Sequence, residues 1–581
     1  MNAPDPTPND AWTALTANWQ DAAAQWTQWW RTASVAPAGA PLGRDAAPAW
    51  PVAHATFDAD AVAALNARYA PRFQALWAAA SGEPAPKHSA SGHDDRRFRG
   101  RSWQEQPYFA FLKDAYLLYA DYLRELAALA QLPPQDRQRL QFVTRQYLDA
   151  IAPTNFPATN PEVLERAFAT DGQSLLRGWS NLVGDASRGR ITMTDESAFV
   201  VGENLAVTPG SVVFRNALIE LIQYDATTPT VHMRPLLVVP PCINKFYILD
   251  MKPENSFVRH AVAQGHTVFM ISWRNIPAEL GALTWDDYIE EGVLAAVRVA
   301  RDITGDKLVN ALGFCVGGTL LACALAVLAV RRHAYVASAT FLTTMLDFSD
   351  PGDIGVYISR EMLAAREPAL MSGQRVHGSE LAAAFASLRA NELVWSYVVS
   401  NYLKGETPPA FDLLYWNGDS SNLPGPMYAF YLQSMYLDNR LRERDALTVA
   451  GARIDLSRLA MPVYVYASRD DHIVPWRSAY RTTALVGGEA KFVLGASGHI
   501  AGVVNPPAPP KRNYWVNDTL PSDADDWFAH AAAVPGSWWP HWYRWIALRA
   551  GARRPAPKAV GSAAHPALEP APGSYVRAAA G

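Results

Sequence analysis

Cysteine is scarce in this chain, charge is sparse and no apolar run is long. Cys242, Cys315 and Cys323 are the only cysteines among 581 residues, too few for a disulfide framework, which favours a reducing cytoplasm. No apolar stretch has the length of a transmembrane segment, and no basic segment followed by an apolar one opens the chain, so we expect no secretion. Charged residues make up 18% of the chain and the formal net charge is −4, which argues against general nucleic-acid binding.

Sequence patterns of several common sites are also missing. The chain has no GxxxxGK[ST] loop, no GxGxxG pattern and no CxxC pair, and these would indicate phosphate, dinucleotide or redox sites. No group of His, Cys and Asp residues has the spacing of metal ligands. We therefore expect no metal.

The chain is long enough for at least two domains and a large core. Residues 1–195 predict a mainly helical N-terminal domain, in which 1–55 is partly disordered because 34–53 is a Pro/Ala/Gly linker. Residues 551–581 are rich in Pro and Ala and are expected to be disordered. Five tryptophans at near-heptad spacing predict a helix that either packs on the protein or presents an aromatic stripe to an apolar partner: Trp12, Trp19, Trp26, Trp29 and Trp30.

The pattern changes after about residue 199, where apolar strands begin to alternate with helices. Two early antiparallel strands, VVFRN and IELIQY, are followed by six apolar strands at 236–240, 266–273, 307–312, 335–344, 462–468 and 491–496. This alternation over 196–550 predicts a parallel sheet covered by helices on both faces. The long helical segment between about 346 and 445 is expected to form a cap over the active site.

One turn in this domain has the pattern of a nucleophile. Cys315 lies in Gly313-Phe314-Cys315-Val316-Gly317, between an apolar strand and an apolar helix. Strand, G-x-C-x-G and helix form a nucleophile elbow with cysteine in place of serine. Glycines permit the tight turn, the helix N-terminus favours a thiolate, and the backbone N–H of Val316 can face an oxyanion. The pattern alone fits a buried structural cysteine equally well, and the strand–turn–helix context favours a nucleophile.

The partners of this cysteine are expected after later strands, in the chain order nucleophile, acid, base. Asp471 follows the strand at 462–468 and is the candidate acid, with Asp470 and Asp347 as weaker alternatives. His499 follows the strand at 491–496 and is the candidate base. Both positions lie at carboxyl ends of strands, where open α/β sheets build their sites.

Other residues are also candidates for the site formed by Cys315, Asp471 and His499. The loop after the strand at 236–240 should supply a second oxyanion donor, the backbone N–H of Ile243. Cys242, His472 and Trp416 are candidates to face the substrate, although a small packed residue in a tight loop is the preferred interpretation of Cys242. Cys323 is interpreted as helix packing.

The choice of cysteine indicates a class of substrate. Moving an acyl group from a thioester onto a thiol is nearly energy-neutral and gives a reactive covalent intermediate. The elbow therefore favours acyl transfer from thioesters over hydrolysis, but names neither the acyl group nor its acceptor.

Longer segments of the sequence resemble polyhydroxyalkanoate synthases from about residue 94 to 548. The resemblance is carried by GFCVGGT, PPCINKFYILD, SWRN, LLYWNGDSSNLPGPMY, DDHIVPW, GHIAGVVN, PTNFPATNPE and TPGSVVFRNALIELIQY. It implies an α/β-hydrolase fold and, from chain length and the elbow, the single-subunit class I enzymes that act on short-chain substrates.

The resemblance also implies roles and partners. Cys315 would carry the growing chain, His499 would be the general base, and Asp471 would assist the hydroxyl of the incoming (R)-3-hydroxyacyl-CoA, mainly 3-hydroxybutyryl-CoA. Whether Asp471 does this or orients His499 stays open. The implied partners are a second copy in a homodimer, the surface of cytoplasmic polyester granules and granule-associated proteins, with no added cofactor. The alternatives are a thioesterase or polyester depolymerase on the same fold and, as a third class, a non-enzymatic granule or scaffold protein.

Overall fold

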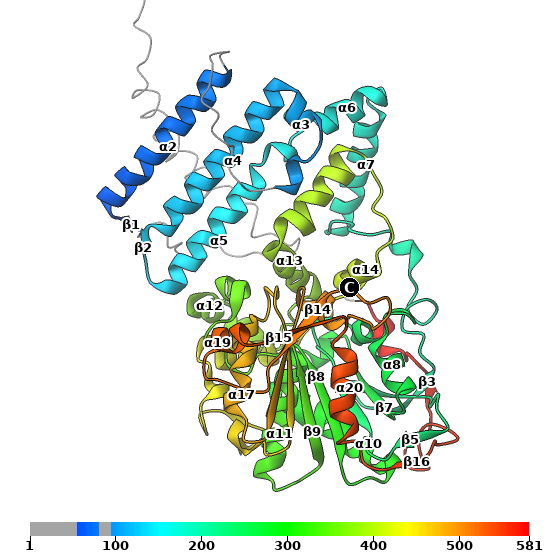
Figure 1. The fold of residues 1–581 in the computed structure, drawn as a ribbon. Helices are drawn as coiled ribbons and strands as arrows, with labels where there is room; N and C mark the ends of the chain where they lie inside the picture. The colour runs from blue at the N-terminus through cyan, green and yellow to red at the C-terminus, as the bar shows by residue number, and fades with distance from the viewer. Residues whose placement is uncertain (1–54, 81–94, 580–581) are drawn as a thin grey trace, which may run out of the picture.

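The computed structural model describes residues 55–80 and 95–579 (Figure 1). The predicted tryptophan stripe and the linker that follows it lie outside the described residues. In the described part, a group of long helices lies at one end of the molecule and a large mixed sheet with its covering helices lies at the other (Figure 1).

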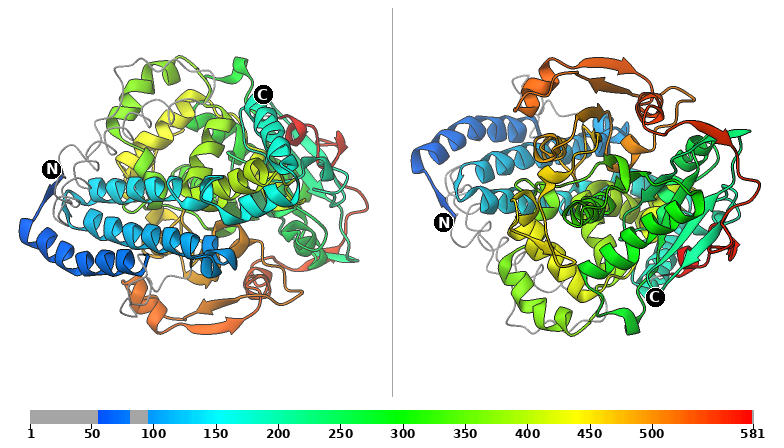
Figure 2. Two further views of the ribbon diagram at one scale, coloured as in Figure 1. Left: turned by 90° about the horizontal axis from the view of Figure 1, so that it is seen from above. Right: turned by 90° about the horizontal axis from the view of Figure 1, so that it is seen from below.

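The N-terminal part is helical, as the sequence predicts. Its main helices are α2 (Ala59–Ala80), α4 (Pro107–Ala128), α5 (Pro134–Ala150), α6 (Pro161–Ala169) and α7 (Gln173–Arg188). Helix α4 packs between α2 and α5, and the three lie side by side in Figures 1 and 2. Asn160 begins α6, because its side chain accepts hydrogen bonds from Glu162 N at 3.0 Å and Val163 N at 3.3 Å.

Eleven described strands form the central sheet, in the order β15-β14-β13-β12-β9-β8-β6-β7-β4-β3-β17. The early pair β3 (Gly210–Arg215) and β4 (Ile219–Tyr224) is antiparallel, as predicted. The six predicted apolar strands are β6 (Leu236–Val239), β7 (Val268–Trp273), β8 (Val309–Phe314), β9 (Val336–Leu342), β12 (Val463–Ser468) and β13 (Ala490–Gly495), and they pair in parallel.

The sheet continues beyond the strand that the sequence pattern treats as its last. Strand β14 (Asn513–Val516) pairs antiparallel with β13, and β15 (Ala532–Pro535) pairs antiparallel with β14. Each has four residues and mixes polar or small residues with apolar ones, so neither gives the apolar run that predicts a strand. The sheet is therefore mixed, and His499 follows the last parallel strand but not the last strand of the sheet.

Helices cover both faces of the sheet, and the strands alternate between the two cores. Leu237 and Val239 of β6 belong to the core under α11 (Val316–Val330), whereas Leu236 and Val238 belong to the core under α8 (Phe257–Ala263) and α20 (Trp539–Ala547). Burial of one such side chain stabilises the fold by roughly 1.5–3 kcal/mol. Packing on both faces fixes the register of the strands, and with it the position of every loop at their carboxyl ends.

The segment between β9 and β12 is largely helical. It contains α12 (Arg360–Met371), α13 (Gly378–Leu388), the π-helices Asn391–Trp395, Val398–Leu403 and Leu432–Leu437, and the short helices α14 (Asp412–Gly418) and α15 (Gly425–Tyr431). The N-terminal helices rest on this segment: Arg145 forms an ion pair with Asp353 at 2.9 Å, and Gln146 donates to Ser387 O at 2.7 Å. The insertion therefore connects the N-terminal helices to the sheet.

The prediction that the C-terminal tail is disordered is wrong for residues 551–579. Strand β16 (Arg553–Pro555) pairs with β5 (Thr230–His232), and β17 (Glu569–Pro570) pairs with β3. The guanidinium of Arg554 donates to Thr304 O at 2.7 Å. The tail is held by contacts to residues far away in the sequence, which a Pro/Ala-rich composition does not reveal.

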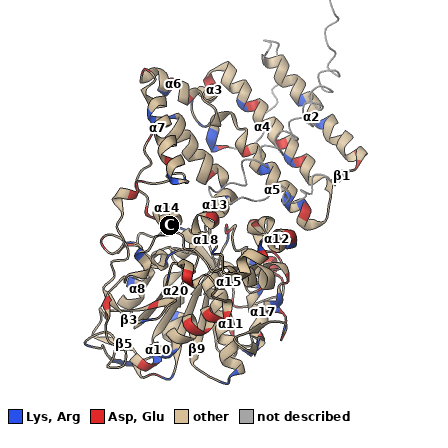
Figure 3. Cartoon of the chain, turned by 180° about the vertical axis from the view of Figure 1, so that it is seen from behind, with Lys and Arg blue, Asp and Glu red and all other residues tan. Residues whose placement is uncertain are grey.

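Acidic and basic residues are interspersed over the molecule (Figure 3). Among the described helices none is both long and apolar enough to span a bilayer.

Candidate active site

Cys315 occupies a strained turn between β8 and α11. Its backbone has φ 54° and ψ −129°, a conformation that disfavours non-glycine residues by roughly 1–3 kcal/mol. The turn is held by Cys315 N, which donates to Leu342 O at 3.0 Å. The two glycines are needed for space: a Cβ on Gly313 would lie 2.4 Å from Gly318 Cα, and a Cβ on Gly317 would lie 2.3 Å from Val239 O. The predicted nucleophile elbow is thus present in the structure.

The structure brings His499 and Asp471 together at the same edge of the sheet. His499 Nδ1 lies 2.6 Å from Asp471 Oδ2, and both side chains are buried. The other carboxylate oxygen, Asp471 Oδ1, accepts from Ile473 N at 2.8 Å and Val474 N at 2.9 Å. A carboxylate fixed in this way keeps the proton of a neutral imidazole on Nδ1 and leaves Nε2 able to accept one.

The ring of His499 is fixed from a second side. Phe314, which precedes the cysteine, stacks on the imidazole with ring centroids 5.5 Å apart. The end of β8 therefore positions both the thiol of Cys315 and the imidazole of His499.

Opposing effects act on the pKa of His499. Burial alone would lower it, but the charge of Asp471, the charge of a Cys315 thiolate and hydrogen bonds to both raise the pKa of His499 to about 10. The arrangement favours the protonated, imidazolium form of His499. Cys315 is partly exposed, whereas the other two cysteines are buried.

The pKa of the neighbouring His472 is shifted in the opposite direction. Burial, together with the positive charges of Arg389 and His499, lowers the pKa of His472 to about 4, although Asp471 opposes the shift. His472 is therefore neutral near pH 7 and does not replace His499 as the partner of Asp471.

The other two cysteines lack the setting of a nucleophile. Cys242 and Cys323 are buried, and burial raises the pKa of each to about 12, so both thiols stay protonated at neutral pH. The structure agrees with the interpretation of Cys323 as packing. Cys242 is 2% exposed, yet it lies close enough to Cys315 for the charge of a thiolate there to act on it.

Neither alternative acid contacts His499. The carboxylate of Asp347 accepts hydrogen bonds from Ser349 N at 2.8 Å and Asn439 Nδ2 at 2.9 Å, which stabilises its own loop. Asp470 is exposed, and its backbone N donates to Ser497 O at 3.0 Å. Of the three candidates, Asp471 has the geometry of the acid.

The predicted oxyanion donors come from adjacent backbone. Val316 is the first residue of α11, so its N–H has no partner within the helix. The tight approach of Gly317 to Val239 O and Pro240 O places this helix end against the loop that contains Ile243. The carbonyl of Ile243 accepts from Ser421 N at 2.7 Å, which ties that loop to the insertion.

Trp416 also lies in this region, as part of the packing. It is 5% exposed, and its indole donates to Lys245 O at 2.7 Å. It belongs to the same buried cluster as Phe246, Tyr247 and Phe314.

Two tyrosines of the insertion lie close to Cys315, and no pattern in the sequence indicates this. Burial raises the pKa of Tyr431 and of Tyr436, and the charge of Cys315 raises both further. Their rings meet edge to face at 5.3 Å. Both follow Cys315 by more than a hundred residues, and only the tertiary fold brings them to it.

Over residues 55–80 and 95–579, no group of three or more His, Cys, Asp and Glu side chains is arranged to bind a metal ion.

Comparison with known proteins gives matches over most of the chain. A family model described as the poly-beta-hydroxybutyrate polymerase (PhaC) N-terminus matches residues 94–261, and the alpha/beta hydrolase fold model matches 235–506. The poly(3-hydroxyalkanoate) polymerase subunit PhaC of Cupriavidus necator is 51% identical over 522 residues, which cover 89% of this chain and 88% of that protein. The protein of the same name from Rhizobium meliloti is 42% identical, over 83% of this chain and 80% of that one.

The poly(3-hydroxyalkanoate) polymerase of Methylorubrum extorquens is 43% identical, over 87% of this chain and 85% of that protein. Identities at this level extend across the N-terminal helices and the sheet domain alike. The family resemblance seen in the sequence is therefore confirmed: the chain belongs to the poly(3-hydroxyalkanoate) polymerases, acyltransferases built on the alpha/beta hydrolase fold.

Proposed function

We propose that this chain polymerises (R)-3-hydroxyacyl-CoA, mainly 3-hydroxybutyryl-CoA, into polyester and releases CoA through a covalent acyl intermediate on Cys315. The observation that supports the proposal most strongly is the bond of 2.6 Å between Asp471 and the histidine that faces the elbow cysteine. The names of the relatives supply the substrate class.

The first step is acylation of the enzyme. The thiolate of Cys315 attacks the thioester carbonyl, and the backbone N–H groups of Val316 and Ile243 stabilise the oxyanion that forms. The bond from the carbonyl carbon to the sulfur of CoA then breaks, and His499 Nε2 gives its proton to the departing CoA thiolate. The enzyme now carries a hydroxyacyl thioester, and His499 is neutral.

Elongation uses the same groups. Neutral His499 accepts the proton of the 3-hydroxyl of the next substrate as that oxygen attacks the acyl-Cys315 carbonyl, which forms an ester and frees the thiolate. The thiolate then attacks the thioester of the lengthened chain, and CoA leaves. Asp471 holds the imidazole by Nδ1 through both steps, so we assign it the role of orienting His499.

The insertion at about 346–445 acts as the cap of this site. Water would hydrolyse the acyl thioester, so a polymerase needs an apolar covering above the cysteine. Tyr431 and Tyr436 supply such a covering, since both are largely buried and close to Cys315. Entry of a CoA thioester then requires movement of part of the insertion.

The proposal also includes the enzyme class, the oligomeric state and the location of the protein. We assign the chain to class I, acting on four- and five-carbon substrates without an added cofactor. We further propose a homodimer in the cytoplasm at the surface of polyester granules, together with granule-associated proteins.

The experiment is to mix pure protein with 3-hydroxybutyryl-CoA and to follow free thiol and insoluble material. The proposal predicts stoichiometric CoA release with formation of polyester. Release of CoA with free 3-hydroxybutyrate as the product would instead indicate a thioesterase.

A further inference from the structure

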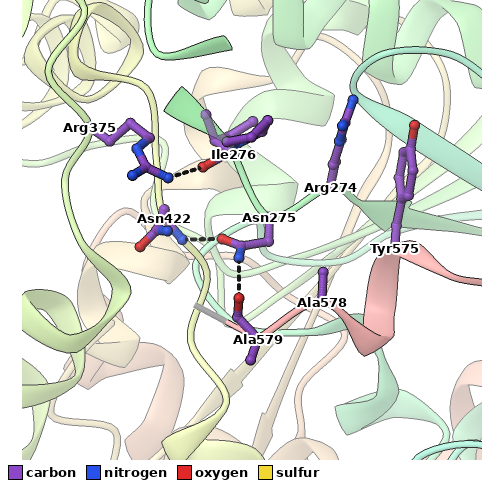
Figure 4. A pocket seen from close by; sticks show the side chains of 9 residues that line it. Arg274, Asn275, Ile276, Arg375, Asn422, Tyr575, Ala578 and Ala579 are labelled. Carbon is purple, nitrogen blue, oxygen red and sulfur yellow. Dashed lines mark hydrogen bonds between the residues drawn. The ribbon is translucent and has the colours of Figure 1, made fainter. Parts of the chain in front are cut away.

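A cavity of about 470 Å³ opens at the carboxyl end of β7 and has no role in the mechanism above. Its lining includes Arg274, Asn275, Arg375, Asn422, Tyr575 and Ala579 (Figure 4). Cavities that bind small molecules fall in this range of volume. Asn275 and Asn422 belong to SWRN and LLYWNGDSSNLPGPMY, two of the segments that carry the family resemblance.

Hydrogen bonds fix the shape of this cavity. The side chain of Asn275 accepts from Asn422 N at 2.9 Å and donates to Ala579 O at 2.6 Å. Arg375 donates to Ile276 O at 2.9 Å. The loop after β7, the insertion and the C-terminal tail are thereby joined around one opening (Figure 4).

The cavity carries two positive charges and no acidic residue in its lining. Among the described residues, the ion pairs include neither Arg274 nor Arg375. The carboxylates that come near Tyr575, those of Glu220 and Glu569, both bind Arg215. The guanidinium of each cavity arginine has one described hydrogen bond, to a backbone oxygen, which leaves most of its five N–H donors for a ligand.

Arg274 also has an aromatic neighbour. The guanidinium of Arg274 lies over the ring of Tyr575 at 5.3 Å from its centroid. A planar base can stack on such a surface, while guanidinium groups bind phosphate with paired N–H donors. Figure 4 shows Arg375 on one side of the opening and Arg274 with Tyr575 on the other.

The location fits a ligand connected with the acyl-transfer site. In the sheet, β6 alone separates β7 from β8, which leads into Cys315. Two strand spacings amount to roughly 10 Å, and ligands of open α/β sheets bind outside the carboxyl ends of the strands.

We propose that this cavity binds the phosphate-bearing end of a nucleotide ligand through Arg274 and Arg375, with the guanidinium of Arg274 on the ring of Tyr575 as the stacking surface. Two sources share this chemistry: the phosphorylated adenosine end of the CoA thioester itself, or a separate nucleotide. The first source rests on the proposed function, and the second does not.

The test is a calorimetric titration with adenosine 3′,5′-bisphosphate as the probe. The parent protein should bind it, and Arg274→Gln and Arg375→Gln should each weaken binding about tenfold or more, since each removes a charged donor. Arg298→Gln, which changes an exposed arginine of α10 (Ala295–Thr304) outside the cavity, should bind like the parent. Absence of binding to the parent, or equal affinity in all four proteins, would overturn the proposal.

Steady-state kinetics with 3-hydroxybutyryl-CoA distinguishes the two sources. If the cavity holds the phosphates of the substrate, both cavity variants should raise KM about tenfold with kcat unchanged, and the probe should inhibit competitively. If it holds a separate nucleotide, KM should stay at the parental value while binding of the probe is lost. The titration needs no turnover, so a failure of the polymerase assignment would leave its result intact.

Discussion

Replacement of Gly317 by alanine tests how closely the elbow positions the two proposed oxyanion donors. A Cβ there would lie 2.3 Å from Val239 O, 2.4 Å from Pro240 O and 2.6 Å from Pro240 C. All three are backbone atoms, so no flexible side chain can move aside. Ordinary contacts of a Cβ begin near 3.4 Å, and the start of α11 and the loop after β6 must therefore separate by about 1 Å.

That separation moves the N–H groups of Val316 and Ile243 apart by a similar amount. A misplacement of 1 Å in an active site reduces the rate on the order of 10²-fold, which corresponds to about 2.7 kcal/mol of transition-state stabilisation. We expect Gly317→Ala to lower kcat for CoA release by about this factor, with a smaller change in KM.

The assay is steady-state CoA release from 3-hydroxybutyryl-CoA, with folding checked by circular dichroism. Gly184→Ala is the matched control, because its Cβ meets only the Arg188 guanidinium at 3.9 Å and alanine favours the helix. A folded Gly317→Ala protein with parental kcat would refute the reasoning.

Three further predictions concern the acid, pH and specificity. Asp471→Asn should slow single-turnover CoA release on the order of 10³-fold or more, because an amide favours the wrong tautomer of His499; normal acylation with slow elongation would instead place Asp471 on the substrate hydroxyl. Burial lowers the pKa of His472 to about 4, so the unfolded chain binds its proton first as pH falls below about 6.5. The contribution of His472 to the free energy of unfolding, taken as the difference from His472→Gln in urea denaturation, should then fall by up to about 1.4 kcal/mol per pH unit between pH 6.5 and 5; an equal slope in the two proteins would contradict this. The third prediction is that kcat/KM falls from C4 to C10 thioesters, because Phe246, Tyr247 and Trp416 are buried near the site and fill space that a longer arm needs; a rise with chain length would show an open alkyl channel.

The parts of the site that can be predicted from the sequence are those marked by short patterns of neighbouring residues. The elbow is recognisable because the glycines at 313 and 317 are required by contacts within a few residues of Cys315 or with the neighbouring strand. Asp471 and His499 are recognisable because each directly follows an apolar strand. Parallel strands align their carboxyl ends, so residues distant in sequence are brought to one edge.

The parts that the sequence does not predict depend on long-range contacts. Tyr431 and Tyr436 reach Cys315 only through the packing of the insertion. The tail from residue 551 looks disordered by composition, yet Arg553 donates to Thr230 O at 3.1 Å and the backbone of Leu568 donates to Val212 O at 2.8 Å. Strands of two or three residues such as β16 and β17 give no periodic signal.

The central claim is that Cys315 carries the growing chain, and peptide mass spectrometry tests it directly. Protein quenched during turnover of 3-hydroxybutyryl-CoA should show hydroxybutyryl units on the peptide that contains Cys315. The folded Cys315→Ala variant should show no adduct and release no CoA beyond background. An adduct confined to Cys242 or Cys323, or polymer formed by the Cys315→Ala variant, would contradict the account.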